Sequence, residues 1–267
     1  MKTLTVTVLG ARGSVPVSGS AYARYGCATT SVLVQTAGTD IVLDAGTGIM
    51  NLPADVLEKT TLNLLLTHAH LDHLNGLSMC PFVLTKGNEV HVRAAYQKGE
   101  PLSDVLKELY APPIWPVTPD NFSSAFFYHT VAPEFEVGDI RVRCMAGVHP
   151  GGVTLYRLSA QGKSFVFATD CTLTEKLYPR AVEFAKGCDL LLVDGQYVDE
   201  EWPMRSGFGH NTWKRAAQLA GDCGAKVVRI VHHDPTHTDD FLDAINEDLR
   251  AINPEWALAR EGEVITL

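Results

Sequence analysis

Three histidines and one aspartate stand within six consecutive positions of this chain. The segment 67–73 is Thr-His-Ala-His-Leu-Asp-His, and its metal-binding side chains are His68, His70, Asp72 and His73. A neutral imidazole donates a lone pair to a metal near physiological pH, and zinc accepts imidazole and carboxylate ligands together. The motif therefore predicts a catalytic metal site, because coincidental histidines in a polar loop would rarely reach this density.

The residues around the motif indicate how these side chains converge. Residues 61–66 form a short apolar run that is typical of a buried strand. If the chain stays extended beyond it, His68 and His70 point to the same side, because side chains alternate along a strand. Asp72 and His73 follow where the chain turns, and they leave in a new direction. One ion cannot easily take four ligands from so tight an arc, so the segment favours two neighbouring ions.

Other candidate ligands also follow predicted strands. They are His149 after 138–144, Asp170 after 164–169, and His232 with His233 after 226–231. Functional side chains are common where loops leave a rigid sheet. A lone histidine in such a place is usually structural, but the repetition of the pattern after a dense histidine motif favours a shared site.

The order of the predicted elements indicates an α/β protein. Apolar or alternating runs predict strands at 3–9, 31–36, 40–43, 61–66, 89–94, 126–131, 138–144, 153–158, 164–169, 189–193, 226–231 and 263–266. Helical spacing predicts helices at 53–59, 74–85, 102–110, 173–186, 211–221 and 238–250. The proline-rich stretch 111–124 must be a loop. The two halves share a rhythm of strands followed by a helix, and we expect residues 1–267 to form one domain.

Composition narrows the classes of partner. The 267 residues are 46% apolar and 20% charged, as in an ordinary globular protein. A net charge of −9 lacks the broad basic surface that nucleic-acid binding requires, so a nucleic-acid partner is not expected. Six cysteines without a C-x-x-C pair predict reduced thiols. With no signal-like or membrane-length apolar run, we expect a cytoplasmic protein that does not enter the membrane.

Taken together, these segments resemble the metallo-β-lactamase-fold hydrolases. The resemblance covers nearly the whole length and is carried by Asp-Ala-Gly-Thr-Gly at 44–48, the motif His68 to His73, His149, Asp170, Gly-His-Asn-Thr-Trp at 209–213, and His232-His233. It implies a four-layer αβ/βα sandwich with two central mixed β-sheets and the metals at one edge of them.

The resemblance also implies a division of the ligands between two divalent ions, with zinc first and manganese or iron as alternatives. The first metal would take His68, His70 and His149. The second would take Asp72, His73 and one of His232 or His233, and Asp170 would bridge the two ions. His232 is favoured because it directly follows its strand. Asp44 would either orient a ligand histidine or serve as a turn residue, and Cys171 is expected to be a buried thiol.

The segment 209–213 resembles the phosphodiesterase branch of this family, which holds the 3′-tRNA processing ribonucleases and smaller cyclic-phosphate hydrolases. It implies that His210 is a general acid beside the substrate phosphate, that Asp72 is a second catalytic residue, and that a hydroxide shared by the metals is the nucleophile. The long insertion that grips tRNA in the ribonucleases is not visible here. We therefore expect a small phosphodiester, such as a cyclic nucleotide, and a homodimer is common in this branch.

Several points stay open at this stage. The same metal site could hydrolyse a lactone, thioester or β-lactam, or could hold iron in a redox or sensor protein. Arg12 and Arg24 either meet phosphate oxygens or are solvated loop residues. His91 and His129 are expected to be structural. His237 either supports the metal site or lies in the start of a helix.

Overall fold

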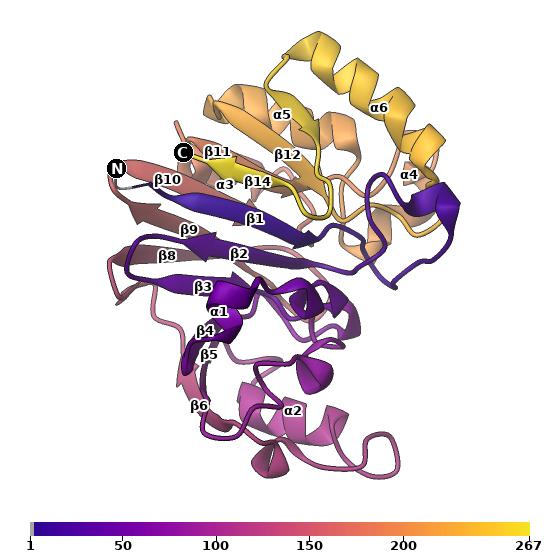
Figure 1. The fold of residues 1–267 in the computed structure, drawn as a ribbon. Helices are drawn as coiled ribbons and strands as arrows, with labels where there is room; N and C mark the ends of the chain where they lie inside the picture. Colours follow the sequence, from indigo (N-terminus) through magenta and orange to yellow (C-terminus); the bar gives the residue numbers. More distant parts are fainter. Residues whose placement is uncertain (1–2) are drawn as a thin grey trace.

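The fold is described from a computed structural model that covers residues 3–267. Two seven-stranded sheets stack face to face (Figure 1). The first has the order β14-β1-β2-β3-β4-β5-β6, with β1 Thr5–Gly10, β2 Ser31–Gln35, β3 Asp40–Leu43, β4 Thr61–Leu65, β5 Glu89–Ala94, β6 Ala125–Thr130 and β14 Val264–Thr266. The second has the order β13-β12-β11-β10-β9-β8-β7, with β7 Glu134–Val137, β8 Ile140–Ala146, β9 Thr154–Ala160, β10 Lys163–Ala168, β11 Leu190–Asp194, β12 Val227–Val231 and β13 Trp256–Leu258.

Helices cover the outer faces of both sheets. They are α1 Ala54–Leu57, α2 Leu102–Leu109, α3 Tyr178–Ala185, α4 Trp202–Arg205, α5 Trp213–Cys223 and α6 Asp239–Ile252. Helices α1 and α2 share a buried core with the first sheet, and α3, α5 and α6 share another with the second. No helix within the described residues is both long and apolar enough to cross a bilayer.

Alternating side chains in each strand fill two different cores. In β10, Phe165 and Phe167 face the first sheet, whereas Val166 and Ala168 face the helices of the second. Because such strands are buried on both faces, they are continuous apolar runs in the sequence. The order of helix, sheet, sheet and helix confirms the predicted fold class of a four-layer sandwich with two mixed sheets.

The parallel strands bring separate parts of the chain to one edge. Strands β3 and β4 are parallel in the first sheet, and β10, β11 and β12 are parallel in the second. Parallel strands end at the same edge of a sheet, so the loops that follow them meet there. This edge receives the segments that carry Asp44, His68, Asp170 and His232.

Three details of the predicted elements were wrong. The stretch 74–85 is not a helix but a series of turns with a short 3₁₀ segment, Leu77–Met79. Gly76 packs so closely on the backbone of Gly46 that a side chain there would lie 2.2 Å from the Gly46 carbonyl oxygen, and Pro81 lacks the amide that a helix would need. Helix α3 begins at Tyr178 instead of 173. Short elements at β7, β13 and α4 were missed because brief strands and helices leave little periodicity.

We predict that Gly48→Ala destabilises the protein. A Cβ at this position would lie 2.7 Å from the nitrogen and 2.8 Å from the Cα of Gly10, and backbone atoms cannot move aside as a flexible side chain can. The free energy of unfolding in urea should fall by about 1–3 kcal/mol. Gly207→Ala is the control, because a Cβ there would meet nothing within 4 Å. Equal unfolding midpoints for the two variants would contradict the prediction.

Candidate metal centre

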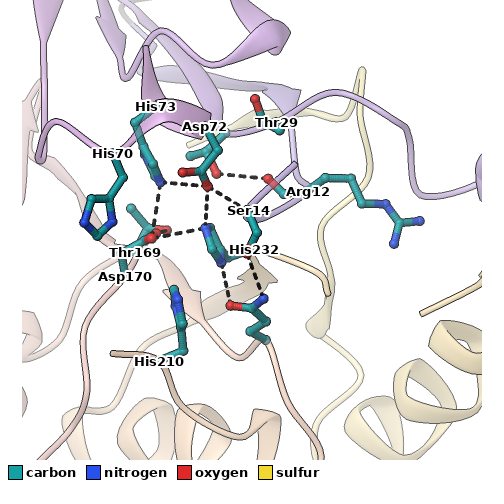
Figure 2. Close-up of polar contacts among 12 residues, drawn as sticks. Arg12, Ser14, Thr29, His70, Asp72, His73, Thr169, Asp170, His210 and His232 are labelled. Atoms are coloured by element: carbon teal, nitrogen blue, oxygen red, sulfur yellow. Dashed lines mark hydrogen bonds and ion pairs between the residues drawn. The ribbon is translucent and has the colours of Figure 1, made fainter. Parts of the chain in front are cut away.

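The predicted ligands converge at the edge of the two sheets in two groups. One consists of His68, His70 and His149, and the other of Asp72, His73, Asp170 and His232. Within each group the candidate ligand atoms all lie within 4.8 Å of one another. Figure 2 shows the second group, with His73 and His232 directed at the two carboxylates. These are the same two sets that the family resemblance implies.

Hydrogen bonds orient the histidines of the first group. The Thr67 hydroxyl donates to Asp44 Oδ2 at 2.8 Å, so its lone pair accepts from His68 Nδ1 at 3.0 Å. His149 Nδ1 donates to the Gly209 carbonyl at 3.0 Å. In both rings Nδ1 carries the proton, and the lone pair of Nε2 is left for a ligand.

The second group is held in the same way. His73 Nδ1 donates to Asp44 Oδ2 at 2.8 Å, and His232 Nδ1 donates to the Gln196 side-chain oxygen at 3.1 Å. Asp44 thus has the orienting contact that was one of its two predicted roles. Directly for His73, and through Thr67 for His68, Asp44 thus orients one ring in each group.

The free nitrogen atoms of these rings fit a metal ion. His68 Nε2 is buried and has no hydrogen-bond partner within the described chain, and His73 Nε2 lies 3.3 Å from Asp170 Oδ2. His149 Nε2 and His70 Nδ1 face each other at 2.9 Å. Since the Nδ1–H of His149 donates to a carbonyl, its Nε2 is an acceptor, and His70 Nδ1–H donates to it in the absence of a metal. Unpartnered buried nitrogens are costly unless a cation or proton binds them.

The charge of the site also fits a cation. Asp72 Oδ2 and Asp170 Oδ2 each lie 3.1 Å from His232 Nε2. Burial alone would raise the pKa of both carboxyls, but the facing imidazoles of His73 and His232 outweigh burial and lower it. Burial lowers the pKa of His68 well below its usual range, so this ring is neutral. Two anionic carboxylates among buried imidazoles form a donor set suited to divalent metal.

Several of these residues have a strained backbone. Asp44, Asp170, His232 and Ser14 have φ values of 60°, 50°, 67° and 63°. Residues with a Cβ rarely adopt this left-handed region, and such conformations cluster at functional sites where the surrounding structure enforces them. At Ser14 the strain aims the backbone N–H at Asp72 Oδ2, which accepts it at 2.7 Å.

The structure distinguishes the adjacent histidines at the end of β12. His232 lies in the second group, and the backbone of Gly13 passes directly over its ring. His233 points the other way, where its Nε2 donates to the Ala259 carbonyl at 2.8 Å. Burial lowers the pKa of His233 to about 3. Of the two alternatives for the last ligand, the structure thus places His232, the favoured one, in the group and His233 outside it.

The expectation that Arg12 meets a substrate phosphate was also wrong, as was its alternative of a solvated loop residue. Its side chain is fully buried and donates to the carbonyls of Gly26 and His237, at 2.8 Å each. It joins the N-terminal loop to the loop before α6. Arg24 is half exposed and pairs with Asp243 at 2.7 Å, away from the candidate ligands.

Histidines outside the predicted pattern lie away from both groups. His91 and His129 stack on adjacent strands of the first sheet, with a nitrogen of each 3.1 Å apart. His237 contacts Glu201 at 3.0 Å. Cys171 is buried, and burial raises its pKa to about 12, which keeps it a protonated thiol as expected.

Sequence reasoning missed Asp194, the last residue of β11. Its Oδ2 accepts a hydrogen bond from His210 Nδ1 at 2.8 Å, and its Oδ1 accepts one from the backbone N–H of Gln196 at 3.0 Å. The His210 ring stacks on that of His232, with centroids 4.7 Å apart. The signal was present, because Asp194 ends an apolar strand as Asp170 does, but strand-end carboxylates are too common to single out alone.

A family model described as "Beta-lactamase superfamily domain" matches residues 39–233. A ribonuclease Z of Brevibacillus brevis is 32% identical over 90 residues, which are 34% of this chain and 27% of that protein. A ribonuclease Z of Methanopyrus kandleri is 23% identical over 98% of this chain and 97% of its own length. The chain thus spans about a quarter to a third of the first curated relatives that it matches.

Solved structures share the fold. The metallo-beta-lactamase fold protein YhfI from Bacillus subtilis superposes with a TM-score of 0.74 at 17% identity, and the match covers 100% of both chains. At this identity the likeness concerns the fold, and it agrees with the two packed sheets described above.

If each group holds one ion, His149→Ala should lower the metal content by about one equivalent per chain. The second group lies on other side chains and should keep its ion. The measurement is elemental analysis after zinc loading and gel filtration. His91→Ala is the control, since His91 is a histidine outside both groups. Full metal content in the His149 variant would contradict this assignment.

Proposed function

This chain belongs to the beta-lactamase superfamily, and we propose that it hydrolyses phosphodiesters with two divalent metal ions, zinc in the first place. His68, His70 and His149 would hold one ion, and Asp72, His73 and His232 the other, with Asp170 between them. The observation that carries the proposal is the pairing of this donor set with His210, which the Asp194 carboxylate holds beside it. When bound, the ions would supply an activated water and neutralise the phosphate.

The side chains of the protein have separate tasks in this proposal. The Nδ1–H of His210 donates a hydrogen bond to Asp194, so its Nε2 is the atom available to the substrate. In the protonated ring, Nε2 donates its proton to the oxygen that leaves phosphorus, while Asp194 stabilises the positive charge of the imidazolium. Asp72 would bind the second metal ion and is also assigned to catalysis. Its Oδ2 accepts a hydrogen bond from the backbone N–H of Ser14, which fixes the position of the carboxylate.

His210 also lies close to Asp170 and Asp194 in a third set of possible ligands. We assign His210 to the substrate instead, because the Asp194 oxygens are already used. They accept from His210, from the Gln196 amide and from the Cys171 amide at 3.3 Å. A carboxylate engaged in this way orients a histidine better than it binds a metal.

We propose a small phosphodiester, such as a cyclic nucleotide, as the substrate. The ribonuclease Z relatives are named for RNA, but a net charge of −9 opposes a long polyanion. A cytoplasmic location and a homodimer belong to the same proposal. All six cysteines are free, which suits a reducing compartment.

A substrate panel tests the reaction class. With zinc bound, the protein should hydrolyse bis-p-nitrophenyl phosphate and 3′,5′-cyclic nucleotides, and chelation should abolish the activity because the water is no longer activated. Precursor tRNA, an aliphatic lactone and nitrocefin are the comparison arms. Turnover confined to the carbonyl substrates would overturn the proposal, and turnover confined to tRNA would overturn the small substrate.

We predict that His210→Ala lowers kcat by about 10²–10⁴-fold, because the leaving oxygen loses its proton donor. The loss should be larger for a nucleoside leaving group than for p-nitrophenolate, which departs without a proton. Asp194→Asn should also lower kcat, because the His210 ring loses the carboxylate that orients it. Metal content should stay near that of the natural protein, and His129→Ala is the matched histidine control. An equal loss with both leaving groups would refute the general-acid role.

A further inference from the structure

A cavity of about 380 Å³ opens beside the first histidine group. One wall is formed by two candidate ligands and the others by a hairpin, a glycine loop and one face of α2. The lining residues are His68, Ala69, His70, Gln97, Lys98, Glu100, Val105, Glu108, Pro150, Gly151 and Gly152. A substrate bound at the metals would extend into this space.

The hairpin defines the backbone position of Lys98, whose side chain is exposed and lines the cavity. The amide of Gln97 donates to the carbonyl of Glu100 at 2.8 Å, and the amide of Glu100 donates back at 2.9 Å. Lys98 and Gly99 form the two-residue turn between them, with φ values of 50° and 91°. Positive φ at both turn residues is typical of the tight type I′ hairpin. The turn therefore presents Lys98 from a defined backbone position.

Lys98 and His70 face each other across Gly151. A Cβ on Gly151 would lie 3.8 Å from His70 Nε2 and 4.0 Å from Lys98 Cε. The position that a Cβ of residue 151 would occupy is thus in van der Waals contact with both side chains, and glycine leaves it empty. Its φ of 92° also disfavours any residue with a side chain there. The space between the metal site and the ammonium group is therefore open.

Lys98 is also a cation without a carboxylate partner. In residues 3–267 no ion pair within 4.0 Å involves its ammonium group, although Glu100 and Glu108 line the same cavity. The other basic side chains near the site are engaged, since Arg205 pairs with Asp234 at 3.0 Å and Arg12 binds backbone carbonyls. Lys98 is thus the basic lining residue that is free to bind an anion.

We propose that Lys98 binds a second anionic group of the substrate, a phosphate or a carboxylate separate from the phosphodiester. The inference rests on the proposed function and narrows its substrate class. The ring of His210 packs on those of His149 and His232, whereas the cavity is lined by His68 and His70 and not by His210. Because His210 serves the leaving oxygen, the second anion belongs to the arm that stays on phosphorus.

Two p-nitrophenyl esters test the proposal. Thymidine 5′-(p-nitrophenyl phosphate) and its 3′-phosphorylated form release the same leaving group and differ in one anion. The zinc-loaded protein should prefer the phosphorylated ester in kcat/KM. Lys98→Gln should reduce that preference about 10-fold, as expected for one charge-assisted hydrogen bond, with little change for the other ester. Lys98→Arg should restore it, and Lys86→Gln, an exposed lysine at the far end of β5, is the control.

A binding measurement separates this inference from the proposed reaction. Calorimetry with the zinc-loaded protein compares thymidine 3′,5′-bisphosphate with thymidine 5′-phosphate, and the bisphosphate should bind more tightly in a Lys98-dependent way. If neither ester is hydrolysed but this dependence holds, the proposed function fails and the Lys98 site stands. If Lys98→Gln weakens both esters equally, or the bisphosphate binds no better than the monophosphate, the Lys98 proposal is overturned. A carboxylate-bearing ester preferred over the phosphorylated one would assign the anion as a carboxylate.

Discussion

Two buried carboxylates approach the same histidine nitrogen, and the surrounding structure must balance their negative charge. Asp72 and Asp170 both approach His232 Nε2 at 3.1 Å, in a place closed to solvent. Two buried carboxylates that are both this close to one atom are tolerated only where positive charge lies between them. Protonated imidazoles supply it in the free protein, since the carboxylates raise the pKa of His232 to about 10 against the opposing effect of burial. Divalent cations would supply it in the loaded protein.

The scaffold holds this charge arrangement through backbone geometry and shared hydrogen bonds. Left-handed conformations at Asp44, Asp170 and His232 turn their side chains sharply away from the strands that they follow. Asp44 then ties His73 directly, and His68 through Thr67, into one network. Strain at these positions is tolerated because the parallel strands beneath them are buried on both faces and cannot relax.

The surroundings of the site differ from side to side. Near β11 and β12, His210 is supported by Asp194 and stacked on His232. Near β4 and the 95–100 hairpin, the site opens into a cavity with a free lysine and two glutamates. A site that is enclosed on one side and open on the other can position the two arms of a diester differently.

The sequence by itself determined most of the strands and helices and the candidate ligands. Periodicity indicated most of the strands, and the dense motif at 67–73 with the strand-end residues Asp170 and His232 indicated the candidate metal site, because these signals are local. Tertiary structure alone decided that His233 faces the core, that Arg12 is buried, that 74–85 is not helical, and that Asp194 holds His210. Each of these depends on contacts with residues distant in sequence, whose positions are fixed only when the two sheets pack.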